Sequence, residues 1–161
     1  MLKLAHSFLG SPINRAIALA LTTGMRRGEI CALRWSDLNE NGTITVSRAL
    51  GVRKGGYYEK EPKTRESRRT IPLAPWLYSY LVSYRDYARE DLRMIGAEFG
   101  DPYILGTQEP KSKPYTPNKL SREFKAFCSA NGFDCSFHDL RHTFASMLIA
   151  EGVDVEQSQA I

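Results

Sequence analysis

Long apolar runs and paired cysteines are what this sequence of 161 residues has little of. The longest unbroken apolar run is "AIALAL", residues 16–21, far below the roughly 20 residues of a membrane-spanning helix. We therefore expect no membrane span. The cysteines are odd in number and fit neither a disulfide framework nor a paired zinc spacing, which predicts a reducing cytoplasm: Cys31, Cys128 and Cys135.

Composition limits the fold and the class of partner. Apolar residues make up 42% of the chain, which is enough for one domain with a core and excludes a disordered chain. Lys and Arg number 22 against 18 for Asp and Glu, giving a formal charge of +4. This balance favours an anionic partner such as nucleic acid, but charge alone does not decide it, because many basic proteins are simply solvated.

The patterns along the chain predict an α+β fold, mainly helical with a small three-stranded antiparallel sheet. Cap residues followed by Pro12 and Pro117 indicate two helix starts. Apolar spacing and stop signals then predict helices over 12–22, after the turn at Gly24, over 75–95, from 117 to Gly132, and from Ser136 onward. Alternating patterns predict strands from Gly42, after the glycine pair at 55 and 56, and over 69–73.

The stretch "SFHDLRHTFAS", residues 136–146, concentrates imidazole and guanidinium groups at a helix start. On a helix, His138 and Arg141 lie about 60° apart, at the edge of an expected core stripe. That stripe consists of Leu140, Phe144, Met147 and Leu148. The first turn also has free backbone N–H groups, which favour an anion.

Three interpretations of this stretch compete. His138 and Arg141 could be ordinary polar residues at a helix start. His138 and His142 have the spacing of two zinc ligands, but the usual glutamate is missing and Arg141 would repel the cation. The third interpretation is phosphate chemistry, in which the arginine binds phosphoryl oxygens and the histidine handles a proton.

The rest of the chain favours the third interpretation. "TTGMRRGEICALRWSDL", "KTRESRRTIPL" and "HDLRHTFAS" occur in this order. Together they resemble the catalytic domain of the tyrosine recombinases, the phage integrase family, over about residues 11–153. The resemblance implies a DNA breaking-rejoining fold and site-specific DNA integration or recombination through a 3′-phosphotyrosine intermediate. It implies no cofactor and no metal.

The resemblance also assigns roles to residues. It implies the catalytic set Arg26, Lys63, His138 and Arg141, with Glu29 holding Arg26 in place and His142 in support. Lys63 is the expected general acid. Arg27 is expected to contact the DNA backbone or solvent. For the hairpin arginines two expectations stay open, phosphate contacts or the charged face of an edge hairpin: Arg65, Arg68 and Arg69.

The sequence departs from the family pattern after Arg141. No tyrosine follows Tyr115, and the expected Gly-His turn is missing. We therefore expect residues 1–161 to be a partial catalytic domain, without the amino-terminal core-binding domain and the tyrosine segment, and unable to form a covalent DNA adduct alone. Rival expectations are a non-catalytic DNA-binding module, or integrase remnant, and a type IB topoisomerase.

The same resemblance predicts the biological setting. It implies an integrase of a bacterial phage or mobile element, acting in the cytoplasm at the nucleoid and not at a membrane. The expected partners are double-stranded DNA and three further copies of the full-length protein, which form a homotetramer on paired DNA sites. DNA-bending accessory proteins are further candidates.

Overall fold

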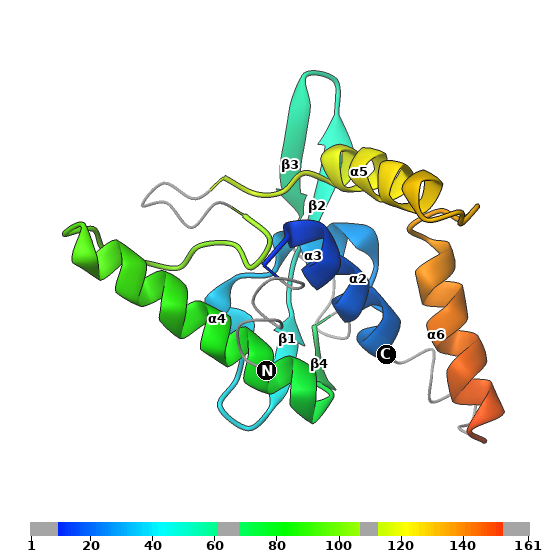
Figure 1. Ribbon diagram of the computed structural model, residues 1–161, viewed down its shortest axis with the longest axis horizontal. Coiled ribbons are helices and arrows are strands. Elements are labelled where there is room, and N and C mark those ends of the chain that lie inside the picture. Colours follow the sequence, from blue (N-terminus) through cyan, green and yellow to red (C-terminus); the bar gives the residue numbers. More distant parts are fainter. Residues whose placement is uncertain (1–9, 61–67, 107–112, 153–161) are drawn as a thin grey trace.

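The computed structural model describes residues 10–60, 68–106 and 113–152. Lys63 and Arg65, two of the predicted site residues, lie outside these ranges. In chain order the helices and strands are α2 (Pro12–Thr23), α3 (Arg27–Ala32), the 3-10 helix η1 (Trp35–Asp37), β1 (Thr43–Val46), β2 (Ala49–Arg53), β3 (Gly56–Lys60), β4 (Arg69–Pro72), α4 (Pro75–Met94), α5 (Pro117–Ala130) and α6 (Asp139–Ala150) (Figure 1). The fold is α+β, as predicted.

Local signals at the helix ends explain α2 and α5. Proline occupies the first turn of each helix, where its missing N–H costs nothing. Gly24 ends α2 in the left-handed conformation (φ 63°), and its N–H donates to the carbonyl of Ala20. Thr116 caps α5 by accepting a hydrogen bond from the N–H of Lys119. The predicted bounds of these two helices are confirmed to within two residues.

The helix after Gly24 is shorter than its apolar spacing predicts. α3 ends at Ala32 because Leu33 adopts an extended conformation (ψ 134°). The carbonyl of Leu33 accepts a hydrogen bond from the N–H of Ile104 at 2.8 Å, and Arg34 forms a β-bridge with Tyr103. Contacts with residues about 70 positions away in the sequence thus end α3 earlier than the local apolar pattern predicts.

The prediction of one three-stranded sheet is wrong for the described residues, which form two antiparallel pairs. β1 pairs with β4, and β2 pairs with β3. Pairing is interrupted at Ser47 and Arg48, where the Arg48 guanidinium donates to the carboxylate of Asp37 at 2.8 Å. The β2–β3 hairpin projects from one end of the molecule, while the β1–β4 pair lies on the other side of α2 and α3 (Figure 1).

The core lies between α2, α3, the β1–β4 pair and the inner faces of α4 and α5. Fully buried side chains come from each of these elements: Leu19, Ile30, Ile44, Leu77, Leu81 and Leu120. Burial of this apolar surface is the main stabilising contribution to the fold. Among the residues that the structure describes, no helix is long and apolar enough to cross a membrane.

Helix α6 packs differently from the others. It contacts α2 along one edge (Figure 1), yet none of its residues is buried. Of its predicted core stripe, Leu140, Phe144 and Leu148 are half-buried, whereas Met147 is 56% exposed. The prediction for Met147 is therefore wrong, because only one edge of the helix meets a neighbour in the described part of the chain.

Candidate active site

Arg26 lies at the turn between α2 and α3. Gly24 turns the chain and Met25 is buried, so that Arg26 projects from the amino end of α3 with 66% of its side chain exposed. Its backbone N–H donates to Oε2 of Glu29 at 2.8 Å, and its Nη1 donates to Oε1 of the same carboxylate at 3.3 Å. Glu29 thus holds both the main chain and the side chain of Arg26.

Glu29 is itself held from a second direction. The guanidinium of Arg69, on β4, donates from Nη1 to Oε1 at 3.1 Å and from Nη2 to Oε2 at 2.8 Å. Burial raises the pKa of the Glu29 carboxyl, but the hydrogen bonds and charges of Arg69 and Arg26 outweigh it, so the pKa lies below its usual value. The carboxylate is therefore ionised at neutral pH.

Close packing against the hairpin fixes α3. A Cβ atom at Gly28 would lie 2.6 Å from the carbonyl oxygen of Leu50, on β2. Only glycine permits this approach without displacing the backbone. Within four residues, the "RRGE" sequence thus supplies the Arg26 cation, the close approach of Gly28 to β2, and the Glu29 carboxylate.

Arg141 reaches this same turn from α6. Its Nη1 donates to the carbonyl of Gly24, and the ring of Phe144 covers Gly24 so closely that no Cβ atom would fit. Burial lowers the pKa of Arg141, and the positive charges of Arg26 and Arg69 lower it further. Arginine stays charged despite such shifts. Arg26 and Arg69 bind the Glu29 carboxylate directly, and Arg141 adds a third guanidinium within range of its charge, so these four described side chains carry two positive charges in excess.

His138 stands immediately before α6 and is exposed. Its ring meets that of His142 edge to face, with centroids 4.6 Å apart. The preceding turn is capped: Asp139 accepts hydrogen bonds from the backbone N–H and the hydroxyl of Ser136, at 2.7 and 2.9 Å. The predicted start of this helix at Ser136 is three residues too early, because α6 begins at Asp139.

The part of the site that the structure describes does not form a metal centre. Within residues 10–60, 68–106 and 113–152, no three His, Cys, Asp or Glu side chains cluster as metal ligands would. His138 and His142 have Arg141 beside them, which disfavours a cation. The three cysteines are free thiols.

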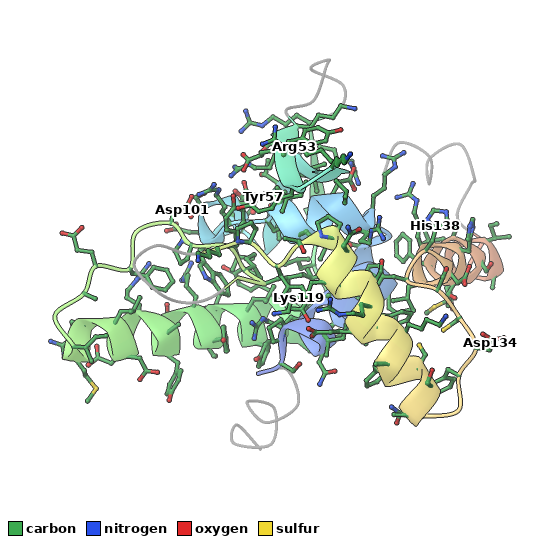
Figure 2. The ribbon with its side chains drawn as sticks, turned by 90° about the horizontal axis from the view of Figure 1, so that it is seen from above. Arg53, Tyr57, Asp101, Lys119, Asp134 and His138 are labelled. Atoms are coloured by element: carbon green, nitrogen blue, oxygen red, sulfur yellow. The ribbon has the colours of Figure 1, made fainter. Side chains whose placement is uncertain are left out.

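The remaining predicted residues lie around this cluster in different ways. Arg27 is exposed and donates to the hydroxyl of Ser121 on α5. Arg68 is exposed just before β4, whereas the Arg69 side chain is only 14% exposed and faces Glu29. Figure 2 shows His138 at the start of α6, well apart from Arg53 on the projecting hairpin. The Arg69–Glu29 pair is a contact that sequence patterns did not indicate, because 40 residues separate its members.

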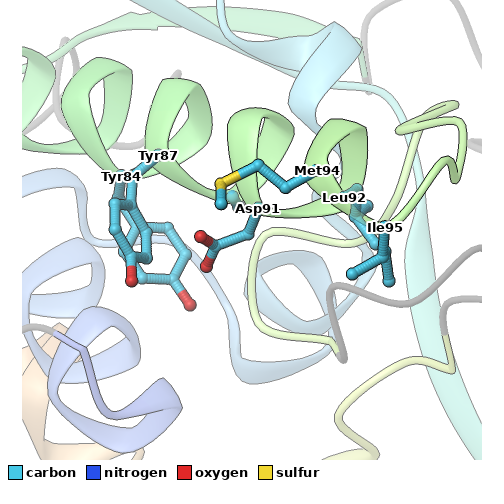
Figure 3. Close-up of a pocket in the computed structure, with 7 residues that line it drawn as sticks. Tyr84, Tyr87, Asp91, Leu92, Met94 and Ile95 are labelled. Atoms are coloured by element: carbon cyan, nitrogen blue, oxygen red, sulfur yellow. The ribbon is translucent and has the colours of Figure 1, made fainter.

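The hollow drawn in Figure 3 shares no residue with this cluster. It has a volume of about 450 Å³, lies along the carboxyl-terminal half of α4, and is lined by Tyr84, Tyr87, Ala88, Asp91, Leu92, Met94 and Ile95. Its lining is mostly apolar, and α4 lies on the opposite side of the molecule from α6 (Figure 1). The arginine cluster around Glu29, with His138 at the start of the helix that carries Arg141, is therefore the better candidate for chemistry.

Comparison with known proteins identifies the family. The description "Phage integrase family" matches residues 3–161. The chain belongs to this family. It is 27% identical over 169 residues to a tyrosine recombinase XerC-like protein of Caldanaerobacter subterraneus subsp. tengcongensis, covering 96% of the chain and 43% of that protein. It is 29% identical over 139 residues to the ICEBs1 integrase of Bacillus subtilis, covering 84% of the chain and 37% of that protein.

Solved structures agree with this assignment. The Tn1549 transposon integrase in complex with circular intermediate DNA matches with a TM-score of 0.66 and 26% identity, covering 88% of the chain and 48% of that structure. The XerA recombinase matches with a TM-score of 0.68 and 20% identity, covering 99% and 50%, which supports the fold. This phage integrase family chain thus spans less than half the length of the curated relatives named above.

Proposed function

We propose that this chain forms the arginine and histidine part of the active site of a site-specific DNA recombinase. The observation that carries the proposal is the junction between Arg141 and the turn that presents Arg26. Two cations 115 positions apart in sequence act on the same carboxylate, that of Glu29, and no other carboxylate among the described residues acts on the pKa of Arg141. A DNA phosphate supplies the negative charge that such a cluster lacks.

The roles proposed for Arg26, Arg141 and His138 follow from the negative charge that develops on the phosphoryl group during the reaction. When a tyrosine oxygen attacks a DNA phosphodiester, negative charge accumulates on the two non-bridging oxygens of the phosphoryl group. Arg26 and Arg141 stabilise that charge without a proton transfer, because a guanidinium is charged throughout. His138 donates a hydrogen bond to the same group or accepts the tyrosine proton.

The bond changes balance without an external energy source. The tyrosine oxygen forms a bond to phosphorus, the bond to the 5′ oxygen breaks, and that oxygen takes a proton from the general acid, for which we propose Lys63. The 3′-phosphotyrosine conserves the phosphoester bond, so a 5′ hydroxyl of another strand can reverse the reaction. DNA strands are thereby exchanged.

The attacking tyrosine in this proposal comes from outside these 161 residues. Tyr115, the last tyrosine of the sequence, is buried. Burial and its hydrogen bond to Glu123 raise the pKa of its hydroxyl, which disfavours the phenolate. Tyr57 and Tyr58 lie on the β2–β3 hairpin rather than after Arg141. With a nicked suicide substrate, we expect this chain to form no covalent DNA adduct, and a trapped phosphotyrosine would contradict the proposal.

DNA binding tests the proposal directly. We expect the chain to bind a DNA duplex with an affinity that falls steeply as salt rises, because the contacts are to phosphates. R26Q and R141Q should each weaken binding about tenfold, as loss of a charged hydrogen-bonding group would. R93Q removes the same charge from the exposed face of α4 and is the matched control, expected to change affinity less than about twofold. Equal losses in all three variants would indicate general electrostatic attraction instead of a site.

A further inference from the structure

We propose that Arg69 is a positioning residue that fixes Arg26 through Glu29, and that it does not contact DNA. This inference rests on the proposed function of the same site. It assigns Arg69 a role that differs from both expectations left open by the sequence, a phosphate contact or the charged face of an edge hairpin.

The exposure of the two arginines separates their roles. The Arg26 side chain is 66% exposed and free to meet a ligand, whereas the Arg69 side chain is only 14% exposed. Arg69 starts β4, where it pairs with Val46 of β1, and its Nε is buried without a hydrogen-bond partner among the described residues. A guanidinium held this far inside the protein is poorly placed to reach a DNA backbone.

The contacts of Glu29 show how Arg69 acts on Arg26. Oε1 accepts one hydrogen bond from Nη1 of Arg69 and one from Nη1 of Arg26. Oε2 accepts one from Nη2 of Arg69 and one from the backbone N–H of Arg26. Each carboxylate oxygen therefore links the two arginines. The paired donors of Arg69 prevent the carboxylate from rotating, and a fixed carboxylate fixes both the main chain and the guanidinium of Arg26.

The charges around Glu29 support this arrangement. Among the described residues, the charged groups that act on it are Arg26 at the amino end of α3, Arg69 on β4 and Arg141 on α6. Burial opposes ionisation of the carboxyl, and the hydrogen bond from Arg69 is the largest effect that lowers its pKa. Without Arg69, the burial of Glu29 would favour protonation, and a protonated carboxyl offers Arg26 a weaker acceptor.

A titration by nuclear magnetic resonance tests the coupling in this chain without DNA. The probes are the side-chain carboxyl carbon of Glu29 and the backbone amide of Arg26. In R69Q we expect Glu29 to protonate at a higher pH than in the unsubstituted chain, and the Arg26 amide to shift with it. R68Q removes an equal charge from the adjacent exposed residue and should leave both titrations unchanged. If R69Q behaves like R68Q, the proposal is wrong.

The lysine variant separates positioning from charge and covers the case in which R69Q fails to fold. R69K keeps the positive charge but cannot donate the paired hydrogen bonds of a guanidinium. We expect the pKa of Glu29 in R69K to lie between those of the unsubstituted chain and R69Q. The Arg26 amide should still move from its original chemical shift at neutral pH. An unchanged Arg26 amide in R69K would mean that charge alone matters and would overturn the positioning role.

A double-mutant cycle then asks whether Arg69 affects DNA only through Glu29. Affinity for a fluorescein-labelled DNA duplex is measured by anisotropy for R69Q, E29Q and the double variant. We expect R69Q to weaken binding about tenfold in the unsubstituted chain but less than twofold in the E29Q background. Losses that multiply in the double variant would show that Arg69 contacts DNA itself. If the unsubstituted chain does not bind DNA, the proposed function fails, while the titration still decides the role of Arg69.

Discussion

Helices α3 and α6 bring the two halves of the proposed cluster together by different means. α3 is packed into the core, with Glu29, Ile30 and Cys31 buried and Gly28 close against β2. α6 has no buried residue and is held to the α2–α3 turn by Arg141 and Phe144. Arg26 is therefore fixed by the fold itself, whereas the position of Arg141 and His138 depends on a few surface contacts.

The strongest test of this difference is to remove the carboxylate that anchors the α3 half. E29A leaves the buried guanidinium of Arg69 without its partner. Breaking a buried ion pair in this way should cost about 3–5 kcal/mol of unfolding free energy, measured by urea denaturation. E90A breaks an exposed pair on α4 and is the control, for which we expect an unchanged urea midpoint. Similar losses in both variants would contradict the anchoring role of Glu29.

Acid should also lower the stability of the fold around α3, because it protonates the Glu29 carboxylate. The pKa of Glu29 is lower in the folded chain than its usual value of 4.5, so its ionised form stabilises the fold above that pH. The stabilisation is lost as the pH falls through the lowered pKa. We therefore expect the stability difference between the unsubstituted chain and E29Q to shrink below about pH 4.5. A difference that is constant with pH would show that the charge of Glu29 is not what matters.

The attachment of α6 should weaken when its contact with the α2–α3 turn, the packing of Phe144 on Gly24, is disturbed. Gly24 has a φ of 63°, and G24A combines strain of about 1–2 kcal/mol with displacement of the Phe144 ring. Gly42 also has a positive φ (80°) but nothing near its missing Cβ, so G42A isolates the strain. We expect hydrogen exchange in α6 to accelerate in G24A and not in G42A. Equal exchange in the two variants would mean that Phe144 does not hold α6.

The smallest expected effects lie within α6. S136A removes the hydroxyl that donates to Asp139 and should cost about 1 kcal/mol, the net value of one hydrogen bond, read from thermal unfolding. M147S replaces an exposed side chain and should change stability by less than about 0.5 kcal/mol. A larger loss in M147S than in S136A would show that α6 is more buried in solution than in this structure.

The sequence predicted the features that depend on residues close together in the chain, and it missed those that depend on contacts between distant residues. The ends of α2 and α5 depend on residues within one turn, such as Pro12 and Thr116, and these were predicted. The end of α3 depends on the distant contact of Leu33 with Ile104, and the role of Arg69 depends on Glu29. An apolar stripe likewise predicts which face of α6 is buried but not whether a neighbour covers it. The resemblance to the family predicted the fold and the residues to inspect, not the contacts between them.

The central claim is that Arg26, His138 and Arg141 form one phosphate-binding cluster. The most direct test is to titrate the isotope-labelled chain with dimethyl phosphate, a minimal phosphodiester, and to follow backbone and guanidinium resonances. We predict that the largest shifts occur together at Arg26, His138 and Arg141, with one common dissociation constant. Shifts confined to the β2–β3 hairpin or to α4, or shifts at these three residues with different constants, would contradict the claim.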